Sequence, residues 1–281
     1  MMDPAASHRF FFELVSPPEE KLDLARAALA IALPGYPRLD TERCVEKIAT
    51  LAARVERRAG GERNAFRLVV AMNLVLFTEE GFRGNSDDYY DPRNSFLNEV
   101  LDRKTGIPIT LSVLYMEVAR RAGLSLQGVG FPGHFLVKCP AEETADELVI
   151  DPFHQGEVTP AGEFASWVRE RHGKRLAFHP GLLDAVSKRQ ILQRMLNNLK
   201  GIYLKQADYG SCLAMVERLL ILDPDSPGEI RDRGIVYFHL ECFSQALADL
   251  ELYLRGTPEA KDAKTVREQV SGLRRFIEGM H

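Results

Sequence analysis

The chain has 281 residues and a mass of 31.6 kDa, about twice the commonest domain size, so two domains are expected. Hydrophobic residues make up 45% and charged residues 27%, a soluble globular balance that excludes collagen-like, disordered and disulfide-scaffold chains. The formal net charge of -4 argues against nucleic acid as the main partner.

The apolar stretches are too short for a membrane span, which needs about 18 residues or more. Residues 10–15 are apolar apart from Glu13 but follow no basic n-region and have no small-residue cleavage site, so we expect no signal peptide and a cytoplasmic protein. No metal and no cofactor is expected, because the four cysteines form no CxxC pair and suit buried apolar positions. They are Cys44, Cys139, Cys212 and Cys242.

Three helices are predicted in the first third of the chain. Ser16-Pro17-Pro18-Glu19 has the spacing of a capping box with proline in the first turn, so a helix is expected to open there and run to Leu33. A second helix is predicted from Thr41 to the glycine pair Gly60-Gly61, because its apolar residues recur at helical spacing. A third is expected over residues 64–78.

From Pro108 onward the pattern changes from helix to strand. Pro108 suits the first turn of a helix that ends at Gly123. Three short β-like runs follow, and a helix followed by antiparallel strands predicts an α+β domain. Another helix is expected to open at Thr159-Pro160, before a linker at residues 173–180. The three runs cover residues 126–131, 134–139 and 148–150.

The last third of the chain repeats itself. Similar residues recur 34 positions apart, the period of a tetratricopeptide repeat, which gives two repeats at 193–226 and 227–260. Gly234 falls where the repeat consensus has glycine, whereas Lys200 and Arg233 depart from that consensus. The matched pairs are Tyr203 with Tyr237, Tyr209 with Phe243, Cys212 with Ala246, and Pro224 with Pro258.

Two repeats cannot bury a continuous core alone, since each leaves an apolar face for its neighbour. Residues 263–277 are expected to cap one end as a helix. We expect the first domain to cover the other end, so that the two domains pack as one rigid unit. The apolar side chains at that end are Ile191, Leu192, Met195, Leu196 and Leu199.

Several motifs resemble the bacterial SirB-type family, which joins a transglutaminase-like domain to tetratricopeptide repeats. The resemblance covers nearly the whole chain and implies an α+β, papain-like domain with a small antiparallel sheet at 1–180, followed by an all-α repeat domain at 181–281. The motifs are Gly81-Phe82-Arg83-Gly84-Asn85, Tyr89-Tyr90-Asp91-Pro92, Asn94-Ser95, Gly106-Ile107-Pro108-Ile109-Thr110-Leu111-Ser112, Gly128-Val129-Gly130-Phe131-Pro132-Gly133-His134-Phe135-Leu136 and Asp151-Pro152-Phe153.

The resemblance also implies a histidine–aspartate pair. Enzymes of this superfamily place a cysteine beside an imidazole that a carboxylate orients. His134 and Asp151 match the family's histidine and aspartate, and we expect them to meet at about 2.7–3.2 Å on neighbouring strands. His154 is a weaker additional candidate. The alternative is that His134 is a partly buried histidine that simply finds a hydrogen-bond partner.

The sequence departs from the enzyme pattern at the nucleophile. The resemblance places the cysteine at Pro108, which cannot attack an acyl group. Ser112 or Thr110 is a possible substitute, although the ordinary role of either hydroxyl is hydrogen bonding within the helix. Cys44 is a more remote possibility. Cys139 lies five residues after His134, so in a regular strand it faces the opposite side.

Two functions follow. The first is a non-catalytic interaction protein whose repeats bind a protein or peptide. The second is a hydrolase or acyl-transferase that uses His134 and Asp151 with an unusual nucleophile or with water. The acidic segment at residues 87–91 lacks the ligand spacing of an EF-hand loop, so calcium is not expected.

Overall fold

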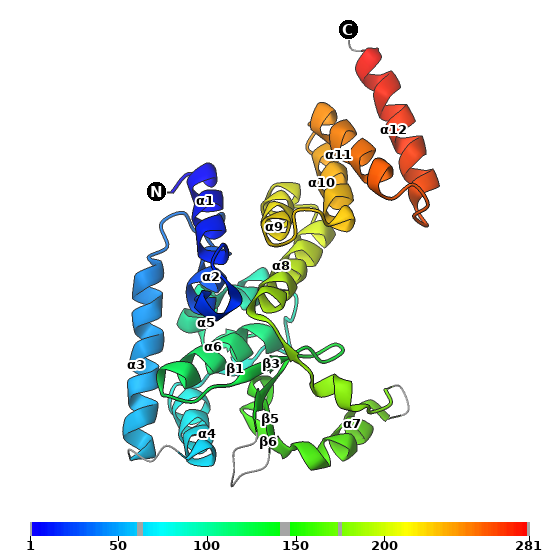
Figure 1. Cartoon of the computed structure of the whole chain (residues 1–281). Coiled ribbons are helices and arrows are strands. Elements are labelled where there is room, and N and C mark those ends of the chain that lie inside the picture. Colours follow the sequence, from blue (N-terminus) through cyan, green and yellow to red (C-terminus); the bar gives the residue numbers. More distant parts are fainter. Residues whose placement is uncertain (1, 61–63, 141–146, 174–175, 280–281) are drawn as a thin grey trace.

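The structure is a computed structural model that describes residues 2–60, 64–140, 147–173 and 176–279. An α+β part carries a row of antiparallel helices that extends away from it to the C-terminus (Figure 1). The predicted α+β class is confirmed. None of the helices within these residues combines the length and the apolar character that a membrane span requires.

The N-terminal helices differ from the prediction. Helix α1 (Pro4–Val15) was not anticipated, although Asp3 caps it by accepting a hydrogen bond from the backbone of Ala6 at 2.8 Å. The helix expected from Ser16 begins instead at Leu24, as α2 (Leu24–Ala30), after a short 3-10 turn. The Asp23 side chain accepts from the Arg26 backbone and supplies the cap that was assigned to Ser16.

Helices α3 (Thr41–Ala59) and α4 (Ala65–Asn73) lie side by side and contribute apolar side chains to the core (Figure 1). The predicted second helix is confirmed, and Gly60 ends it with a φ of 69°, which glycine adopts at little cost. Gly61 lies outside the described residues. The predicted third helix is interrupted, because its last part winds as a π-helical turn, η2 (Leu74–Glu79).

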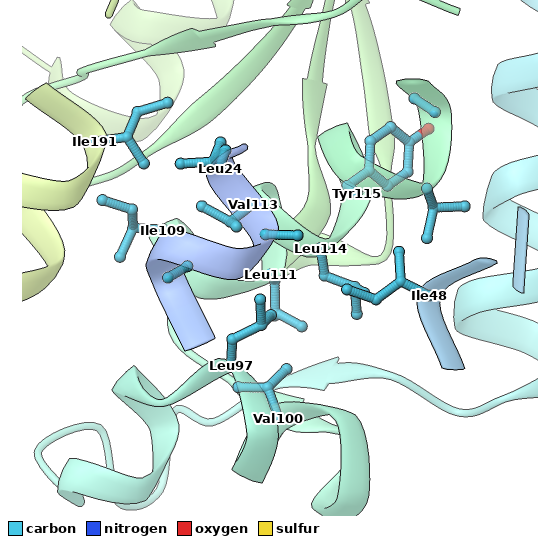
Figure 2. Packing of buried hydrophobic residues seen from close by; sticks show 14 of the residues in the cluster. Leu24, Ile48, Leu97, Val100, Ile109, Leu111, Val113, Leu114, Tyr115 and Ile191 are labelled. Atoms are coloured by element: carbon cyan, nitrogen blue, oxygen red, sulfur yellow. The ribbon is translucent and has the colours of Figure 1, made fainter. Parts of the chain in front are cut away.

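Helix α6 (Pro108–Arg121) lies at the centre of the core. It begins at Pro108, as predicted. Figure 2 shows its apolar side chains surrounded by residues of α2, α3, α5 (Leu97–Arg103) and α8 (Lys188–Lys205). Because α6 carries apolar residues on all sides, it is buried almost completely.

A five-stranded antiparallel sheet packs against α6 in the order β6-β5-β4-β3-β7. The three central strands correspond to the three predicted runs. The edge strands were not anticipated: Thr159 and Pro160 end β6, so the helix expected there begins later, as α7 (Phe164–His172). The strands are β3 (Gln127–Val129), β4 (Leu136–Cys139), β5 (Leu148–Asp151), β6 (Glu157–Pro160) and β7 (Ala185–Val186).

Two helical hairpins and a last helix follow the sheet, as the 34-residue period predicts. Gly234 allows α10 to approach α11 closely, because a Cβ there would lie 3.0 Å from Leu250 Cγ, tighter than ordinary van der Waals contact. Cys212 and Ala246 are fully buried at equivalent positions. After α8, the helices are α9 (Tyr209–Leu222), α10 (Pro227–His239), α11 (Phe243–Gly256) and α12 (Ala263–Glu278).

Ion pairs stand at the two positions that depart from the repeat consensus. Lys200 Nζ lies 2.7 Å from Glu229 and 3.0 Å from Asp232, so it ties α8 to α10. Arg233 binds Asp249 through two nitrogens, at 2.7 and 2.8 Å. Charged pairs therefore join neighbouring helices where the consensus has glycine or leucine.

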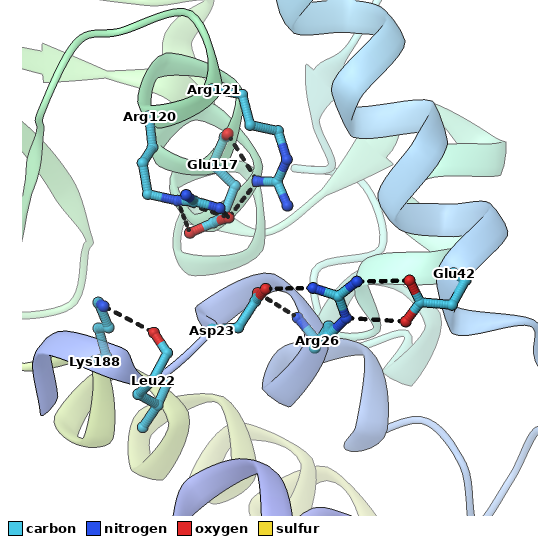
Figure 3. Close-up of polar contacts among 8 residues, drawn as sticks. All are labelled: Leu22, Asp23, Arg26, Glu42, Glu117, Arg120, Arg121 and Lys188. Carbon is cyan, nitrogen blue, oxygen red and sulfur yellow. Dashed lines mark hydrogen bonds and ion pairs between the residues drawn. The ribbon is translucent and has the colours of Figure 1, made fainter. Parts of the chain in front are cut away.

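The repeats are fused to the α+β part through α8. The five apolar side chains expected at that end, from Ile191 to Leu199, are at most 1% exposed and belong to the same buried cluster as α2, α3 and α6, so their predicted burial against the first domain is confirmed. A polar contact adds to the junction, because Lys188 of α8 donates to the Leu22 carbonyl at 2.8 Å (Figure 3). Within the α+β part, Arg26 bridges Asp23 and Glu42 and so joins α2 to α3. Residues 185–186, just after the expected domain boundary at 180, still pair with the sheet.

Candidate functional site

His134 and Asp151 lie side by side at one end of the sheet. Asp151 is the last residue of β5, and His134 lies two residues before β4, on a turn that Gly133 makes with a φ of 70°. His134 was expected to begin the strand, so this detail was wrong. The Nε2 atom of His134 is 2.9 Å from Oδ2 of Asp151, within the predicted hydrogen-bond range. Their catalytic role stays a prediction.

Asp151 holds a second imidazole as well. The 3-10 turn η4 (Pro152–His154) follows β5 directly, and it brings Nδ1 of His154 to 2.7 Å from the same oxygen, Oδ2. The other oxygen, Oδ1, accepts from the backbone nitrogens of Phe153 at 3.1 Å and His154 at 3.3 Å. The carboxylate is therefore oriented by its own backbone and presents one oxygen to both rings.

The carboxylate is buried, with 3% of Asp151 exposed. Burial by itself raises the pKa of Asp151, but hydrogen bonds and charge attraction from His134, and then from His154, bring that pKa below its ordinary value. Asp151 is therefore ionised at neutral pH, so both imidazoles face a carboxylate rather than a carboxylic acid.

Phe153 fixes the two rings in place. Its phenyl ring meets His134 edge-on at a centroid distance of 5.8 Å and His154 at 5.2 Å. Gly84, from the distant strand β1 (Arg83–Gly84), makes room for that phenyl ring, because a Cβ at Gly84 would lie 2.6 Å from it. The glycine of the Gly-Phe-Arg-Gly motif thus supports the histidine pair through Phe153.

The first repeat helix also reaches this site. Arg194 of α8 donates through Nη2 to the backbone carbonyls of Phe131 and His134, and its guanidinium lies 5.3 Å from the Phe135 ring centroid. Burial lowers the pKa of Arg194 below its ordinary value. The turn that carries His134 is therefore held by a residue of the repeat region.

The two candidate hydroxyls are engaged elsewhere. Thr110 Oγ1 donates to the Asn94 carbonyl at 2.7 Å and accepts from the Ile107 backbone at 3.2 Å. The Ser112 hydroxyl lies 3.5 Å from the Phe135 carbonyl, and both side chains are fully buried. These contacts disfavour either residue as a nucleophile.

The four cysteines lie on separate elements. Cys44 is on α3, where burial raises its thiol pKa above the ordinary value. Cys212, on α9, is fully buried, which raises its thiol pKa to about 11. Cys139 is buried on β4, and Cys242 is half-buried before α11. The thiols of Cys44 and Cys212 are protonated at neutral pH and are poor nucleophiles in that form.

A concave feature lies in the repeats and is here called the repeat pocket. It has a volume of about 550 Å³ and opens between α10, α11 and α12. Phe238 and Phe276 stand on its walls with 49% and 52% of their surfaces exposed. The apolar residues lining it are Ile235, Phe238, Phe243, Leu250, Leu273 and Phe276.

Sequence reasoning found part of this arrangement. It named His134 and Asp151 and gave His154 as a weaker candidate, but it did not place both imidazoles on one oxygen. The short spacing from Asp151 to His154 was a usable signal, because a 3-10 turn brings such residues together. Arg194 was missed altogether, since it lies 60 residues from His134.

Comparison with known proteins agrees with this architecture. Residues 42–197 match the transglutaminase-like superfamily, and residues 199–271 match the tetratricopeptide repeat. The class is therefore a transglutaminase-like domain followed by tetratricopeptide repeats.

Among its relatives, a UPF0162 protein of Xylella fastidiosa is 38% identical over 263 residues, 91% of each chain. Protein SirB1 of Salmonella typhimurium is 27% identical over 201 residues, 71% of this chain and 74% of SirB1. The human F-box only protein 21 is 33% identical over 179 residues, 60% of this chain but 28% of its own length. This chain belongs to the UPF0162 family, and the resemblance to SirB-type proteins is confirmed. No solved structure gives a significant match.

Proposed function

We propose that this chain is a non-catalytic interaction protein that binds a peptide or protein segment in the repeat pocket. The observation that carries the proposal is the half-exposed pair Phe238 and Phe276 on the walls of that apolar pocket. Single exposed apolar residues are ordinary, but aromatic residues gathered around one hollow are typical of a binding site. Tetratricopeptide repeats generally mediate protein–protein interaction, which supports this assignment.

The site around His134 supports the non-catalytic part of the proposal. The candidate hydroxyls of Thr110 and Ser112 are buried and bonded to backbone carbonyls. The thiols of Cys44 and Cys212 have raised pKa values. A nucleophile beside the imidazole would need the opposite properties, namely access to substrate and a lowered pKa.

The test is selection of ligands for the full chain from a library of short random peptides. We expect the enriched peptides to share an apolar anchor, to bind the wild type and to lose at least about 10-fold in affinity with Phe276→Asp. Leu252→Asp is the matched control, because Leu252 is 42% exposed on α11 but does not line the pocket. The proposal fails if no peptide is enriched, or if the pocket variant and the control bind equally.

A second candidate function is that of a hydrolase or acyl-transferase. The observation in its favour is the orientation of His134: Nε2 is the nitrogen bonded to Asp151, which directs Nδ1 elsewhere. Turnover of activated esters that His134→Ala abolishes and His239→Ala does not would support this function. Equal slow hydrolysis by all three proteins would argue against it.

A further inference from the structure

Three potential metal ligands converge at one end of the sheet. His134, Asp151 and His154 each offer one ligand atom, and these atoms all lie within 4.8 Å of one another. They come from three segments at this end of the sheet: the turn before β4, the end of β5 and the 3-10 turn η4. Folding alone brings them together, since His134 is 17 residues from Asp151.

Two of the three separations lie close to those around a shared ion. Oδ2 of Asp151 is 2.9 Å from Nε2 of His134 and 2.7 Å from Nδ1 of His154. An ion bonded at about 2.0–2.2 Å to each ligand holds neighbouring ligand atoms roughly 3.0–3.5 Å apart. Oδ2 would move away from each ring nitrogen by a few tenths of an ångström, and the two ring nitrogens, which lie within 4.8 Å of each other, would move closer together. The ion would take the place of the two N–H protons that point at Oδ2, and each ring would then carry its proton on its other nitrogen, Nδ1 of His134 and Nε2 of His154.

The carboxylate is preorganised for this role. Two backbone N–H groups hold Oδ1 of Asp151, so Oδ2 is directed at the two rings before any ion arrives. Metal-bound side chains characteristically have such supporting hydrogen bonds. Phe153 contacts both imidazoles edge-on and restricts their planes. The three ligands are therefore already oriented by the fold, so little conformational entropy would be lost when an ion binds.

The site is also accessible. The His154 side chain is 46% exposed, whereas those of His134 and Asp151 are 14% and 3% exposed. An ion could enter past His154, and water could fill the remaining coordination position. Two imidazoles, one carboxylate and an open position form a ligand set that zinc accepts readily.

We propose that His134, Asp151 and His154 form a binding site for a divalent transition-metal ion of the zinc class. The site lies on the α+β part, so this inference does not depend on peptide binding by the repeats. It also reverses the expectation from the sequence that no metal is bound, because that expectation rested on the spacing of the cysteines.

Titration calorimetry tests the proposal, with ZnCl2 added to the untagged full chain after treatment with a chelator. We expect one Zn²⁺ per chain. Because loss of a supporting residue around a metal typically costs about 10- to 100-fold in affinity, Asp151→Asn and His154→Gln should each weaken binding at least that much. Glutamine keeps a donor for the hydrogen bond to Asp151 but lacks the ring nitrogen. His239→Gln is the control, since His239 is an exposed histidine of the repeats.

Absorption spectroscopy with Co²⁺ provides a second test that does not rely on calorimetry. CoCl2 should give ligand-field absorption with the wild type and His239→Gln, but not with His154→Gln. His154 is half-exposed, so this variant is expected to fold, which circular dichroism can verify. The inference is overturned if the wild type binds neither ion, or if His154→Gln and Asp151→Asn bind both ions as well as the wild type.

Discussion

The end of the sheet around His134 and the repeat pocket differ in how their side chains are satisfied. Around His134, Asp151 accepts from two rings and two backbone nitrogens and is almost fully buried. In the repeat pocket, Phe238 and Phe276 leave about half of their surfaces in contact with solvent. The first region is held by internal contacts, whereas the second has apolar surface that a partner could cover.

Because of this difference, substitutions in the two regions should affect different properties of the protein. Substitutions near His134 should lower the free energy of unfolding, because they leave buried polar groups unpaired. Substitutions on the walls of the repeat pocket should change binding while leaving the fold intact. The two regions are nevertheless joined, because α8 belongs to the core of the first and opens the repeats that contain the second.

The largest effect is expected when that junction is removed. A fragment that begins near Gly181 would expose the five buried apolar side chains of α8 from Ile191 to Leu199, whose burial contributes about 1.5–3 kcal/mol each. We expect this fragment to aggregate, or to melt well below the intact chain, which should unfold in a single transition. Calorimetry of both proteins measures this.

A soluble fragment with the melting temperature of the intact chain would show that the repeats fold independently. In that case the comparison between a buried site and a separate binding pocket would become one between two autonomous domains. Cutting the chain at Gly181 also removes β7 from the sheet, so the complementary fragment, residues 1–180, should lose stability too.

Replacing Asp151 by alanine should have the next largest effect. The substitution leaves two imidazole N–H groups and two backbone N–H groups without their acceptor. Leaving buried donors unsatisfied costs about 1–3 kcal/mol, which chemical denaturation can measure. Glu157→Ala is a control at the start of the neighbouring strand β6, on an exposed side chain, and is expected to change stability by less than about 0.5 kcal/mol.

The contribution of Asp151 should depend on pH. Its pKa is lower in the folded chain than in the unfolded chain, so the unfolded state takes up the proton first as the pH falls. The stability difference between the wild type and Asp151→Ala should therefore be fully present above about pH 4 and should shrink below it. A difference that grew toward acidic pH would contradict the lowered pKa.

The sequence predicted elements whose signals are local or periodic. The helix from Thr41 to the glycine at position 60 and the 34-residue repeats followed from spacing alone. The first helix was missed because residues 10–15 were considered only as a targeting segment, although Asp3-Pro4 is an ordinary helix start. The edge strands β6 and β7 were missed for different reasons: Thr159-Pro160, at the end of β6, has the composition of a helix start, and β7 has only two residues, which pair with β3.

The same distinction applies to the candidate site. A motif identified His134 and Asp151, and their separation of 2.9 Å lies in the range that the motif implied. The contact of Arg194 with the His134 turn carries no local signal, because it arises only when α8 packs on the sheet. The orientation of His154 depends on the 3-10 turn after Asp151, which the sequence did not predict.

A smaller effect is expected for Arg194→Ala. This change removes hydrogen bonds to the carbonyls of Phe131 and His134 and should cost about 1–2 kcal/mol. It should also shift the imidazole NMR signals of His134. A substitution that only destabilises the chain away from this turn would leave those signals unchanged. Arg189→Ala is matched to it, because Arg189 lies on the same helix and donates to the carbonyls of Val15 and Pro17. If the His134 signals did not shift in Arg194→Ala, the repeat region would not hold the turn that carries His134.

The smallest effect on stability is expected for Phe276→Ser in the repeat pocket. About half of Phe276 is exposed, so the substitution loses only about half of the burial of a core phenylalanine and should lower the free energy of unfolding by about 1 kcal/mol. Leu250→Ala, at the buried base of the same pocket, should cost about 2–5 kcal/mol, because it leaves a cavity between helices. Denaturant unfolding measures the free energy of unfolding of both variants and so compares the wall of the pocket with its base. If Phe276→Ser were as destabilising as Leu250→Ala, the exposed ring would be part of the core, and the repeat pocket would no longer be a surface reserved for a partner.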